Sequence, residues 1–501
     1  MNVVPMTPIN TLRILKGVPL DSTYKDTLDF SSVSAQTTYF QGKTKYTYSD
    51  LGPIRMQNAI RVPNRSDNLY DCNYIMFQNT NFGTKWFYAF ITDIRFINVD
   101  MCELVFTLDV IQTWWFDITI KPCYVEREHA NTDAVGDNMV LENMEIGEYV
   151  NEPAEKTTFF DSYVAVIATA YDENGNPGGY VGGMFSGLNY VAGLIDNPQQ
   201  VADLIQALAS IVAAGKADAI ASTFVMPFDF YPEGDTPMLK RFDATRYQTQ
   251  IGAYTPKNKK LLTYPYNYLL ATTSDGGSHA YRYEYFTSDT LCGFVLECGM
   301  GCNPEIVMEP IGYNNQTFNI EESLSLSGFP QFGFAIDTFK AWLAQNANST
   351  YISAVGNALA IGAGIATGNP MATAMGILGA TSTVNNVVMA SVKADQPRGA
   401  QGTNTLVATR EKNFYFYNRH IREDYAKILD DYFSMYGYAT QQTKVPNITG
   451  RPSWNYVKTR DSKIVGSVPF EDISRIRAVF DTGVTFWHGD WVGDYTRNNQ
   501  L

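Results

Sequence analysis

The most enzyme-like cluster in the chain is the sequence VEREH at residues 125–129. Carboxylates and an imidazole are the side chains that bind divalent metals or transfer protons. On a β-strand, successive side chains point to opposite faces, so Glu126 and Glu128 would share one face while His129 points to the other. This geometry is poor for a metal site. It favours a surface charge cluster or a salt bridge between subunits.

The cysteines are the other candidate metal ligands. Their spacing is irregular, and the CxxxC motif near residue 300 has no second pair. A structural zinc site needs four Cys or His ligands with suitable spacing, and the chain has only four histidines. The pattern therefore indicates buried free thiols. The six cysteines are Cys72, Cys102, Cys123, Cys292, Cys298 and Cys302.

The chain lacks the common catalytic motifs. It contains neither GxSxG nor HExxH, and the Gly-Gly pairs at Gly182 and Gly276 follow no phosphate-loop pattern. Glycan cleavage by paired carboxylates stays open, because 51 acidic residues always supply pairs. We predict that the protein is not an enzyme and that it uses no cofactor and no metal.

Length and composition define a large, globular and acidic chain. Its 501 residues suggest about three domains, and 45% of them are hydrophobic. Aromatic residues make up 14% and favour strands, so the composition predicts β-rich structure. The net charge of −14 argues against a nucleic-acid-binding surface, which needs a basic stripe. The N-terminus has no signal-peptide pattern, so we expect folding in a reducing cytoplasm.

Two consecutive strands are predicted between residues 86 and 110. In MCELVFTLDV, which begins at Met101, side chains at alternate positions are apolar, which is typical of a half-buried strand. The preceding sequence WFYAFITDIRFI is also strand-like. Residues 98–100 then form the predicted hairpin loop.

Two amphipathic helices are also predicted. The first covers residues 196–216, where Asn197 can cap the helix and Pro198 suits its first position. The second covers residues 421–437, with acidic residues near its start and Gly437 at its end. The predicted apolar faces consist of Val201, Leu204, Ile205, Leu208 and Val212 in the first helix, and of Tyr425, Ile428, Leu429, Tyr432 and Met435 in the second.

A long segment without charge interrupts this pattern. No charged residue lies between Lys340 and Lys393, although 18% of the chain is charged. Residues 351–392 are rich in Gly and Ala, whereas a core helix usually carries larger and some polar side chains. A permanent membrane anchor would be richer in Leu, Ile, Val and Phe. A third interpretation is a segment that the protein stores and later inserts into lipid, and all three stay open on composition alone.

The segment favours a hairpin of two helices. Residues 351–368 would form about 27 Å of helix, which nearly spans a hydrocarbon core of about 30 Å. Asn369 and Pro370 break the run, and residues 371–392 are of similar length. Small residues recur every four positions, which lets helices approach closely in lipid. The predicted packing residues are Gly356, Ala360, Gly364, Gly368, Ala372, Gly376 and Ala380. The predicted membrane-penetrating residues are Tyr351, Ile352, Val355, Leu359, Ile361, Ile365, Met371, Met375, Ile377, Leu378, Val384, Val387 and Val388.

Several stretches resemble the tail knob, or distal tail tube, proteins of short-tailed phages of the phi-29 type. They are DVIQTWWFDITIKPCYVEREHANTDAVGDNMVLENMEIGEYV from Asp109, KILDDYFSMYGYATQQTKVPNITGRPSWNYVKT from Lys427, GVTFWHGDWVGDYTRNN from Gly483, and NLYDCNYIMFQNTNFGTKWFYAFITDIRFIN from Asn68. The resemblance covers roughly the first 150 and the last 100 residues. The middle region matches only weakly.

The resemblance implies a mainly β fold with some α structure. The chain would be a multi-domain β-barrel or sandwich that assembles into a hexameric tube, with a long hydrophobic inserted loop. The implied domains are an N-terminal β tube domain (1–155), a mixed α/β middle region (156–340), the membrane-active loop (341–398) and a C-terminal domain that completes the tube (399–501).

The same resemblance implies a function in genome ejection. The homohexamer would be assembled in the host cytoplasm and lie in the virion tail, and genomic double-stranded DNA would pass through its lumen without tight binding. The loop would plug the distal end and then penetrate the host cytoplasmic membrane. The implied partners also include other tail proteins, such as the lower collar and a tip cell-wall hydrolase. An alternative is a receptor-binding or adsorption protein of the same virion, which would need an exposed aromatic cleft in the middle region.

Overall fold

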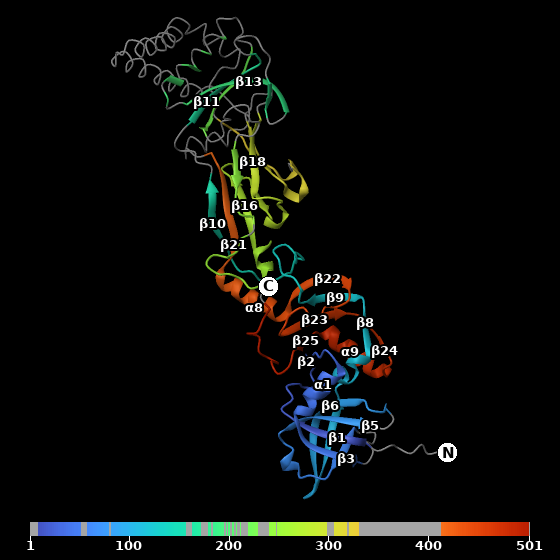
Figure 1. Ribbon diagram of the computed structural model, residues 1–501. Coiled ribbons are helices and arrows are strands. Elements are labelled where there is room, and N and C mark those ends of the chain that lie inside the picture. Colours follow the sequence, from blue (N-terminus) through green and yellow to red (C-terminus); the bar gives the residue numbers. More distant parts are fainter. Residues whose placement is uncertain are drawn as a thin grey trace. The chain divides into compact units, whose positions relative to one another are not determined.

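The computed structural model describes residues 9–51, 58–79, 82–156, 163–171, 179–181, 184–194, 197, 199–200, 203–204, 207, 211, 219–228, 240–246, 248–297, 305–317, 320–329 and 412–499. Within these residues the chain is mainly β, which confirms the predicted fold class (Figure 1). It divides into two compact units. Unit 1 contains residues 1–146, 253–261 and 423–501, and unit 2 contains residues 147–252 and 262–422. The domain boundaries predicted at residues 155, 340 and 398 remain predictions.

The first sheet of unit 1 has the strand order β3-β1-β5-β6-β7-β4. Its strands are β1 (Ile9–Lys16), β3 (Thr44–Leu51), β4 (Ala59–Val62), β5 (Cys72–Asn79), β6 (Trp86–Asn98) and β7 (Met101–Leu108). The predicted hairpin is therefore confirmed, and Cys102, Leu104 and Phe106 of β7 are buried at alternate positions as expected. Helix α1 (Val33–Gly42) is capped by the Ser32 side chain, and the short helix α2 (Val110–Trp114) by that of Asp109.

The second sheet of unit 1 has the order β2-β25-β23-β9-β22. Its strands are β2 (Asp26–Leu28), β9 (Cys123–Glu128), β22 (Tyr438–Lys444), β23 (Trp454–Arg460) and β25 (Val484–Trp487). A separate pair is formed by β8 (Ile118–Lys121) and β24 (Lys463–Gly466). The two longer helices are α8 (Glu423–Tyr436) and α9 (Phe470–Thr482).

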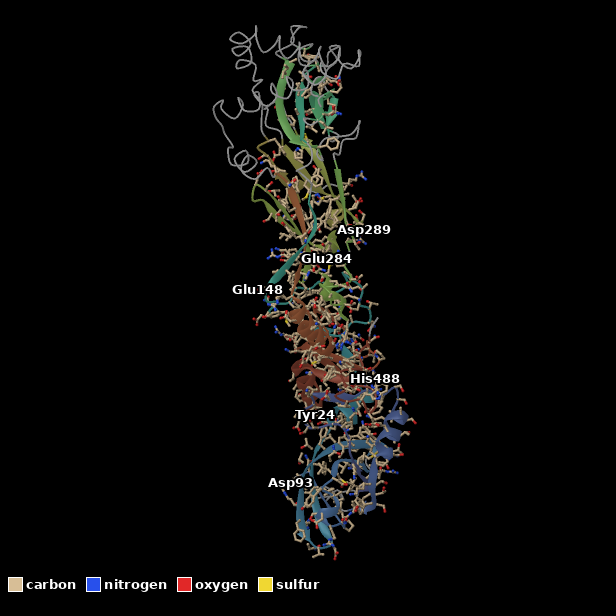
Figure 2. All side chains as sticks on the ribbon, turned by 90° about the vertical axis from the view of Figure 1, so that its left-hand side faces the viewer. Tyr24, Asp93, Glu148, Glu284, Asp289 and His488 are labelled. Atoms are coloured by element: carbon tan, nitrogen blue, oxygen red, sulfur yellow. The ribbon has the colours of Figure 1, made fainter. Side chains whose placement is uncertain are left out.

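Apolar side chains from both sheets form the core of unit 1. One cluster joins Leu104 and Phe106 of β7 to Phe480 of α9 and Phe486 of β25. Polar contacts also join distant chain segments in unit 1. Tyr24, labelled in Figure 2, is an example. Its hydroxyl donates to the Leu108 carbonyl (3.1 Å) and accepts from the Val110 N–H (3.0 Å). Segments far apart in the sequence thus share one core.

Unit 2 contains three four-stranded sheets within the described residues. The first, β10-β21-β16-β17, comprises Tyr149–Lys156, Phe414–Ile421, Asn267–Thr273 and Ser278–Tyr281. The second, β12-β13-β11-β14, comprises Gly179–Val181, Met184–Leu194, Tyr163–Thr169 and Ile220–Pro227. The third, β15-β18-β19-β20, comprises Lys240–Asp243, Thr290–Glu297, Glu305–Pro310 and Leu324–Leu326. Among the described residues of both units, short 3₁₀ turns lie at Ser66–Asn68, Trp115–Asp117, Lys259–Leu262, Tyr283–Tyr285, Tyr313–Asn315 and Ile320–Glu322.

The first predicted helix is confirmed at its described positions. Residues 199, 200, 203, 204, 207 and 211 are helical. The Asn197 carboxamide oxygen accepts from the backbone N–H groups of Gln199 (3.1 Å) and Gln200 (3.3 Å), as a helix cap should. Leu204, on the predicted apolar face, is buried.

The second predicted helix is α8, and Gly437 follows it with a positive φ of 67°. Its predicted apolar face is wrong, however, because Leu429 is the only member of that face that is buried, and Ile428 is 65% exposed. The buried face consists of Ala426, Leu429, Asp430, Phe433 and Ser434. Two polar residues thus point inward, because they have hydrogen-bond partners inside the unit.

Asp430 binds a segment that is distant in sequence, residues 253–261. One carboxylate oxygen accepts from the Tyr254 hydroxyl (2.6 Å) and the Lys257 N–H (2.8 Å). The other oxygen accepts from the backbone N–H (2.9 Å) and the side-chain amide (2.8 Å) of Asn258. Asp430 is fully buried, so these four donors replace the water that its charge would otherwise bind. The contact fixes residues 253–261 in unit 1.

We predict that Asp430→Asn destabilises unit 1 by about 2–4 kcal/mol, because an amide NH2 would replace one of the two acceptor oxygens and leave the two donors that this oxygen now binds without an acceptor. The measurement is denaturant unfolding followed by tryptophan fluorescence, since six of the seven tryptophans belong to unit 1. Asp431→Asn is the matched control, because Asp431 is the exposed neighbour on the same helix. Equal stability of the two variants would contradict the anchoring role of Asp430.

Candidate functional site

The residues predicted to enter the membrane lie outside the described residues. This applies to all of residues 351–392, including the break at Asn369 and Pro370, and also to Cys298 and Cys302. Among the residues that the structure describes, no helix is both long and apolar enough to cross a membrane. The predicted roles of the apolar segment therefore remain predictions.

The VEREH cluster lies at the end of β9, and its predicted geometry is wrong. The pairing of β9 with β23 shifts register between Lys458 and Thr459, because Lys458 lies opposite Arg127 and Thr459 opposite Val125. This β-bulge leaves one extra residue in β9 and disturbs the alternation of faces. Glu128 is consequently buried, with only 2% of its surface exposed, while Glu126 stays partly exposed. Glu128 and His129 are therefore not part of a surface charge cluster, whereas Glu126 forms one with Lys458 and Arg460. The alternative, a salt bridge between subunits, remains a prediction.

Glu128 and His129 have structural contacts inside unit 1. Glu128 forms an ion pair with Lys444 and accepts from the Asn447 N–H (2.8 Å). The fully buried His129 ring accepts at Nδ1 from the Tyr456 N–H (2.7 Å), so its Nε2–H donates to the Ser434 carbonyl (3.0 Å). Both ring nitrogens are therefore occupied, and His129 is not placed to accept a proton from a substrate.

The buried carboxylate of Glu142 contacts Arg127 of the VEREH cluster. Glu142 forms ion pairs with Arg127 and Lys260, and it accepts from the Ala439 N–H (3.1 Å). Arg127 also donates to the Gly437 carbonyl (2.6 Å). Residues 142 and 260 come from different parts of the chain, so this contact joins β9 and β22 to the 253–261 segment.

Gly437 is required where α8 turns into β22. A Cβ atom at this position would lie 2.2 Å from the Glu128 carbonyl oxygen, and the φ of 67° is one that L side chains rarely adopt. The glycine was predicted as a helix end, and the structure adds the close approach of β9. Helix α8 and strand β9 can therefore pack in direct contact.

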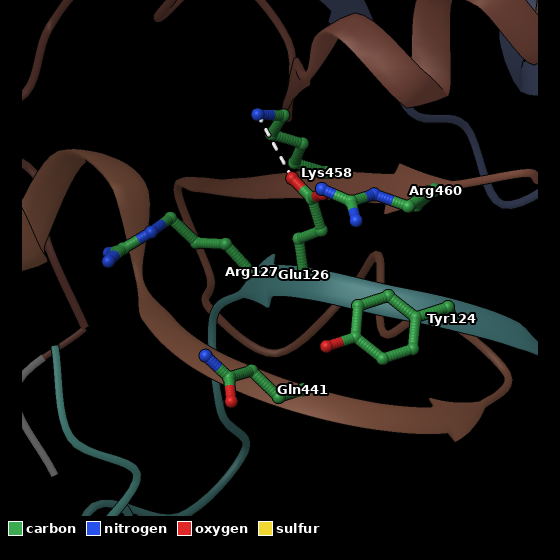
Figure 3. Close-up of a pocket in the computed structure, with 6 residues that line it drawn as sticks. All are labelled: Tyr124, Glu126, Arg127, Gln441, Lys458 and Arg460. Carbon is green, nitrogen blue, oxygen red and sulfur yellow. Dashed lines mark ion pairs between the residues drawn. The ribbon is translucent and has the colours of Figure 1, made fainter.

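A pocket of about 420 Å³ opens on the solvent side of β22, β9 and β23 (Figure 3). Figure 3 shows Lys458 and Arg460 of β23 converging on Glu126 of β9. The two ion pairs measure 3.0 Å for Lys458 and 2.6 Å for Arg460. Partial burial opposes ionisation of Glu126, but the two cations together lower its pKa. The lining residues are Tyr124, Glu126, Arg127, Gln441, Lys458 and Arg460.

The described side chains are arranged for packing and ion pairing. Within the described ranges, no group of three or more His, Cys, Asp and Glu side chains could hold a metal ion. Cys72, Cys102 and Cys123 are buried free thiols and Cys292 is a buried thiol outside any disulfide, which confirms the prediction for these four. Burial raises the pKa of the Cys72 thiol to about 11, and this thiol therefore stays protonated and unreactive at neutral pH.

Reasoning from the sequence missed the residues that build this region. Asp430, Asn258, Glu142 and Lys260 meet only in the folded unit, and more than 100 residues separate the partners of the main contacts. The available signal was Asp430, an acidic residue at a helix position between the apolar residues Leu429 and Phe433. A polar residue among core positions needs a buried partner.

Comparisons with known proteins agree with the β-rich fold of the chain. Residues 235–500 match the family model for the C-terminal domain of tail knob protein gp9 of Bacillus phage phi29, and residues 9–119 match that for the N-terminus of the caudoviral major tail protein. Tail knob proteins gp9 of Bacillus phages B103 and phi29 are each 26% identical over 602 residues, covering 100% of this chain and of each relative. The structure of the bacteriophage C1 tail knob protein gp12 has the same fold, with a TM-score of 0.58 and 16% identity over 98% of this chain and 100% of that one.

The fold and the matched models define a structural component of a phage virion tail. The chain belongs to the family of the phi29 tail knob protein gp9, whose C-terminal model spans more than half of its length. The family resemblance inferred from the sequence motifs is thereby confirmed. The relatives are named for a structural part of a short tail and not for a reaction, and a tail knob protein acts together with other tail components.

The buried His129 predicts a pH dependence of stability. Burial and the nearby Arg451 guanidinium lower the pKa of His129 well below its ordinary value of 6.5. Below pH 6.5 the unfolded chain binds a proton that the folded chain excludes, so the contribution of His129 to stability is present above pH 6.5 and is lost as the pH falls. The loss approaches about 1.4 kcal/mol per pH unit.

The measurement compares the free energy of unfolding of wild type and His129→Gln between pH 7.5 and pH 5. We expect the variant to be less stable at pH 7.5 and to lose less stability on acidification. Burial raises the pKa of Asp109 to about 6, so Asp109 contributes stability as the pH falls. This contribution is the same in wild type and in His129→Gln, so it does not affect their comparison. Parallel curves for wild type and His129→Gln would contradict the assignment.

Proposed function

We propose that six copies of the chain form a tube that conducts the genomic DNA, and that residues 351–392 plug its distal end and then penetrate the host cytoplasmic membrane. The observation that carries this proposal is the charge-free stretch between Lys340 and Lys393 in a chain of which 18% is charged. Membership of the tail knob family supports it, because a tail knob protein is part of the path between virion and cell.

The composition of the segment supports conditional insertion. Leu, Ile, Val and Met side chains would face the lipid, while Gly364 and Gly376 would allow helices to pack closely. Small residues keep the segment only moderately apolar, so a protein can store it away from water and release it later. A charge near the middle of either helix would cost about 2.5–3.5 kcal/mol on insertion into a bilayer.

The charge balance supports a conduit. Each chain contributes −14, so a ring of six would repel the phosphate backbone and let DNA slide without adhering. The described cations agree with this, since Lys458, Arg460, Lys260 and Lys412 all form ion pairs with carboxylates of the same chain. With 51 acidic against 37 basic residues, the chain has no surplus of positive charge to neutralise phosphates.

We predict that the protein releases dye from liposomes, and that Ile365→Asp and a deletion of residues 351–392 slow the release at least about tenfold, as expected for a central charge. Val465→Asp is the matched control, because Val465 is an apolar residue that is 47% exposed on β24 in unit 1. Equal release by all four proteins would mean that the apolar segment is part of the core and not a membrane-active element.

A separate prediction concerns the affinity of the protein for DNA. We expect no measurable affinity for duplex DNA at physiological salt, because the acidic chain has no surplus of cations to release counterions from the phosphates. Fluorescence anisotropy with a labelled duplex over a range of salt concentrations checks this. A tight complex that weakens steeply with salt would contradict the conduit in this form.

A further inference from the structure

The pocket on β22, β9 and β23 is formed where all three strands depart from regular pairing. The β9–β23 register shifts between Lys458 and Thr459, and the β22–β9 register shifts between Ala439 and Gln442. These bulges lie side by side, so they hollow the same part of the sheet face. A regular sheet of the same residues would present a flat surface instead.

Gln441, on the rim of this pocket, has a strained backbone. Its φ is 49°, in the left-handed region that a residue other than glycine rarely adopts. Such conformations persist where surrounding structure enforces them, and they are concentrated at binding sites. The bulge in β22 thus brings the Gln441 carboxamide to the pocket, where Tyr124 and Arg460 also contribute hydrogen-bond donors.

The charges of the pocket leave a local positive excess. Arg127 is compensated by the buried Glu142, so the balance is set by Lys458 and Arg460 against Glu126. Two cations share one carboxylate, and the Arg460 side chain is 75% exposed. Several of their N–H donors therefore stay available in a chain whose net charge is −14.

The surroundings of the pocket are typical of a protein interface. The Arg127 guanidinium lies over the Tyr432 ring, 4.8 Å from its centroid. One turn earlier on α8, Ile428 is 65% exposed, and Tyr124 in the pocket wall is 38% exposed. Arg and Tyr are enriched in the contact surfaces between proteins, and the exposed Ile428 adds apolar surface beside them. A phosphate-binding groove would instead carry a continuous row of cations without a central carboxylate.

We propose that this pocket binds an acidic side chain from a second copy of the chain, with Arg460 and Lys458 as donors to its carboxylate. Each copy carries 51 acidic and 37 basic residues, so neighbouring copies repel each other unless basic sites are matched to carboxylates across the contact. A carboxylate takes two parallel hydrogen bonds from a guanidinium, which the exposed Arg460 can supply. The inference rests on the proposed ring, and it identifies one contact that holds adjacent copies together.

The test measures the assembly of the full chain by sedimentation velocity at low and high salt. The variants are Arg460→Glu and the double change Lys458→Gln with Arg460→Gln. We expect each to raise the dissociation constant of the assembly about tenfold or more at low salt, with a smaller effect at high salt. Arg61→Glu is the matched control, since Arg61 is also an exposed strand residue paired with a glutamate, Glu103, and it should assemble like wild type.

Circular dichroism and thermal unfolding verify that the variants fold, which the exposure of Arg460 leads us to expect. A short poly-glutamate peptide should compete with assembly of the wild type. Wild-type assembly with no change in either variant would overturn the pocket contact but leave the ring intact, whereas a monomeric wild type would overturn both. An equal loss in Arg61→Glu would overturn the specific site in favour of general electrostatics. Duplex DNA binding that is lost in Arg460→Glu would assign the pocket to nucleic acid and overturn the proposal.

Discussion

The carboxylate of Asp430 is the interaction on which the organisation of unit 1 depends. It is fully buried, and four donors from Tyr254, Lys257 and Asn258 surround it. Asp430 helps to hold residues 253–261 in unit 1, although the chain before and after them belongs to unit 2. The same segment supplies Lys260 to Glu142, and Asn258 accepts from Arg451 (3.0 Å). One buried charge therefore organises contacts among three distant parts of the sequence.

Much of the local structure could be predicted because it depends on neighbours in sequence. The alternation in β7, the Asn197 cap and the glycine after α8 each follow from a few consecutive residues. The wrong predictions concern features that depend on residues far apart in the sequence. The buried face of α8 is shifted because Asp430 finds partners more than 170 residues away, and Glu128 is buried because of a bulge that requires β23 as a partner. No local pattern contains that information.

The two candidate sites, the apolar segment and the pocket, also differ in whether the sequence alone could predict them. The apolar segment is visible in composition alone, since the absence of charge over many residues needs no partner to be recognised, and the family motifs then suggest a use for it. The pocket could not be predicted, because it depends on two coincident bulges, in β9 and β22, and these strands come from distant parts of the sequence of unit 1. The VEREH sequence contains residues of the candidate pocket, although it was considered for catalysis. Glu126 lines the charged pocket, and Glu128 is buried in the unit. His129 bridges two backbone groups by hydrogen bonds.

The distribution of charge connects the proposed conduit with the proposed contact between copies. A tube that must not retain DNA benefits from acidic excess, yet six acidic chains repel each other when they assemble. Ion pairs within the chain, as at Lys412 with Asp275 (2.6 Å), balance part of the positive charge of the described residues. A pocket such as that of Arg460 places positive charge where it can meet a carboxylate at a protein contact. The same acidic composition can then serve both assembly and the passage of DNA, because basic side chains are matched to carboxylates between copies while the acidic excess repels the phosphates.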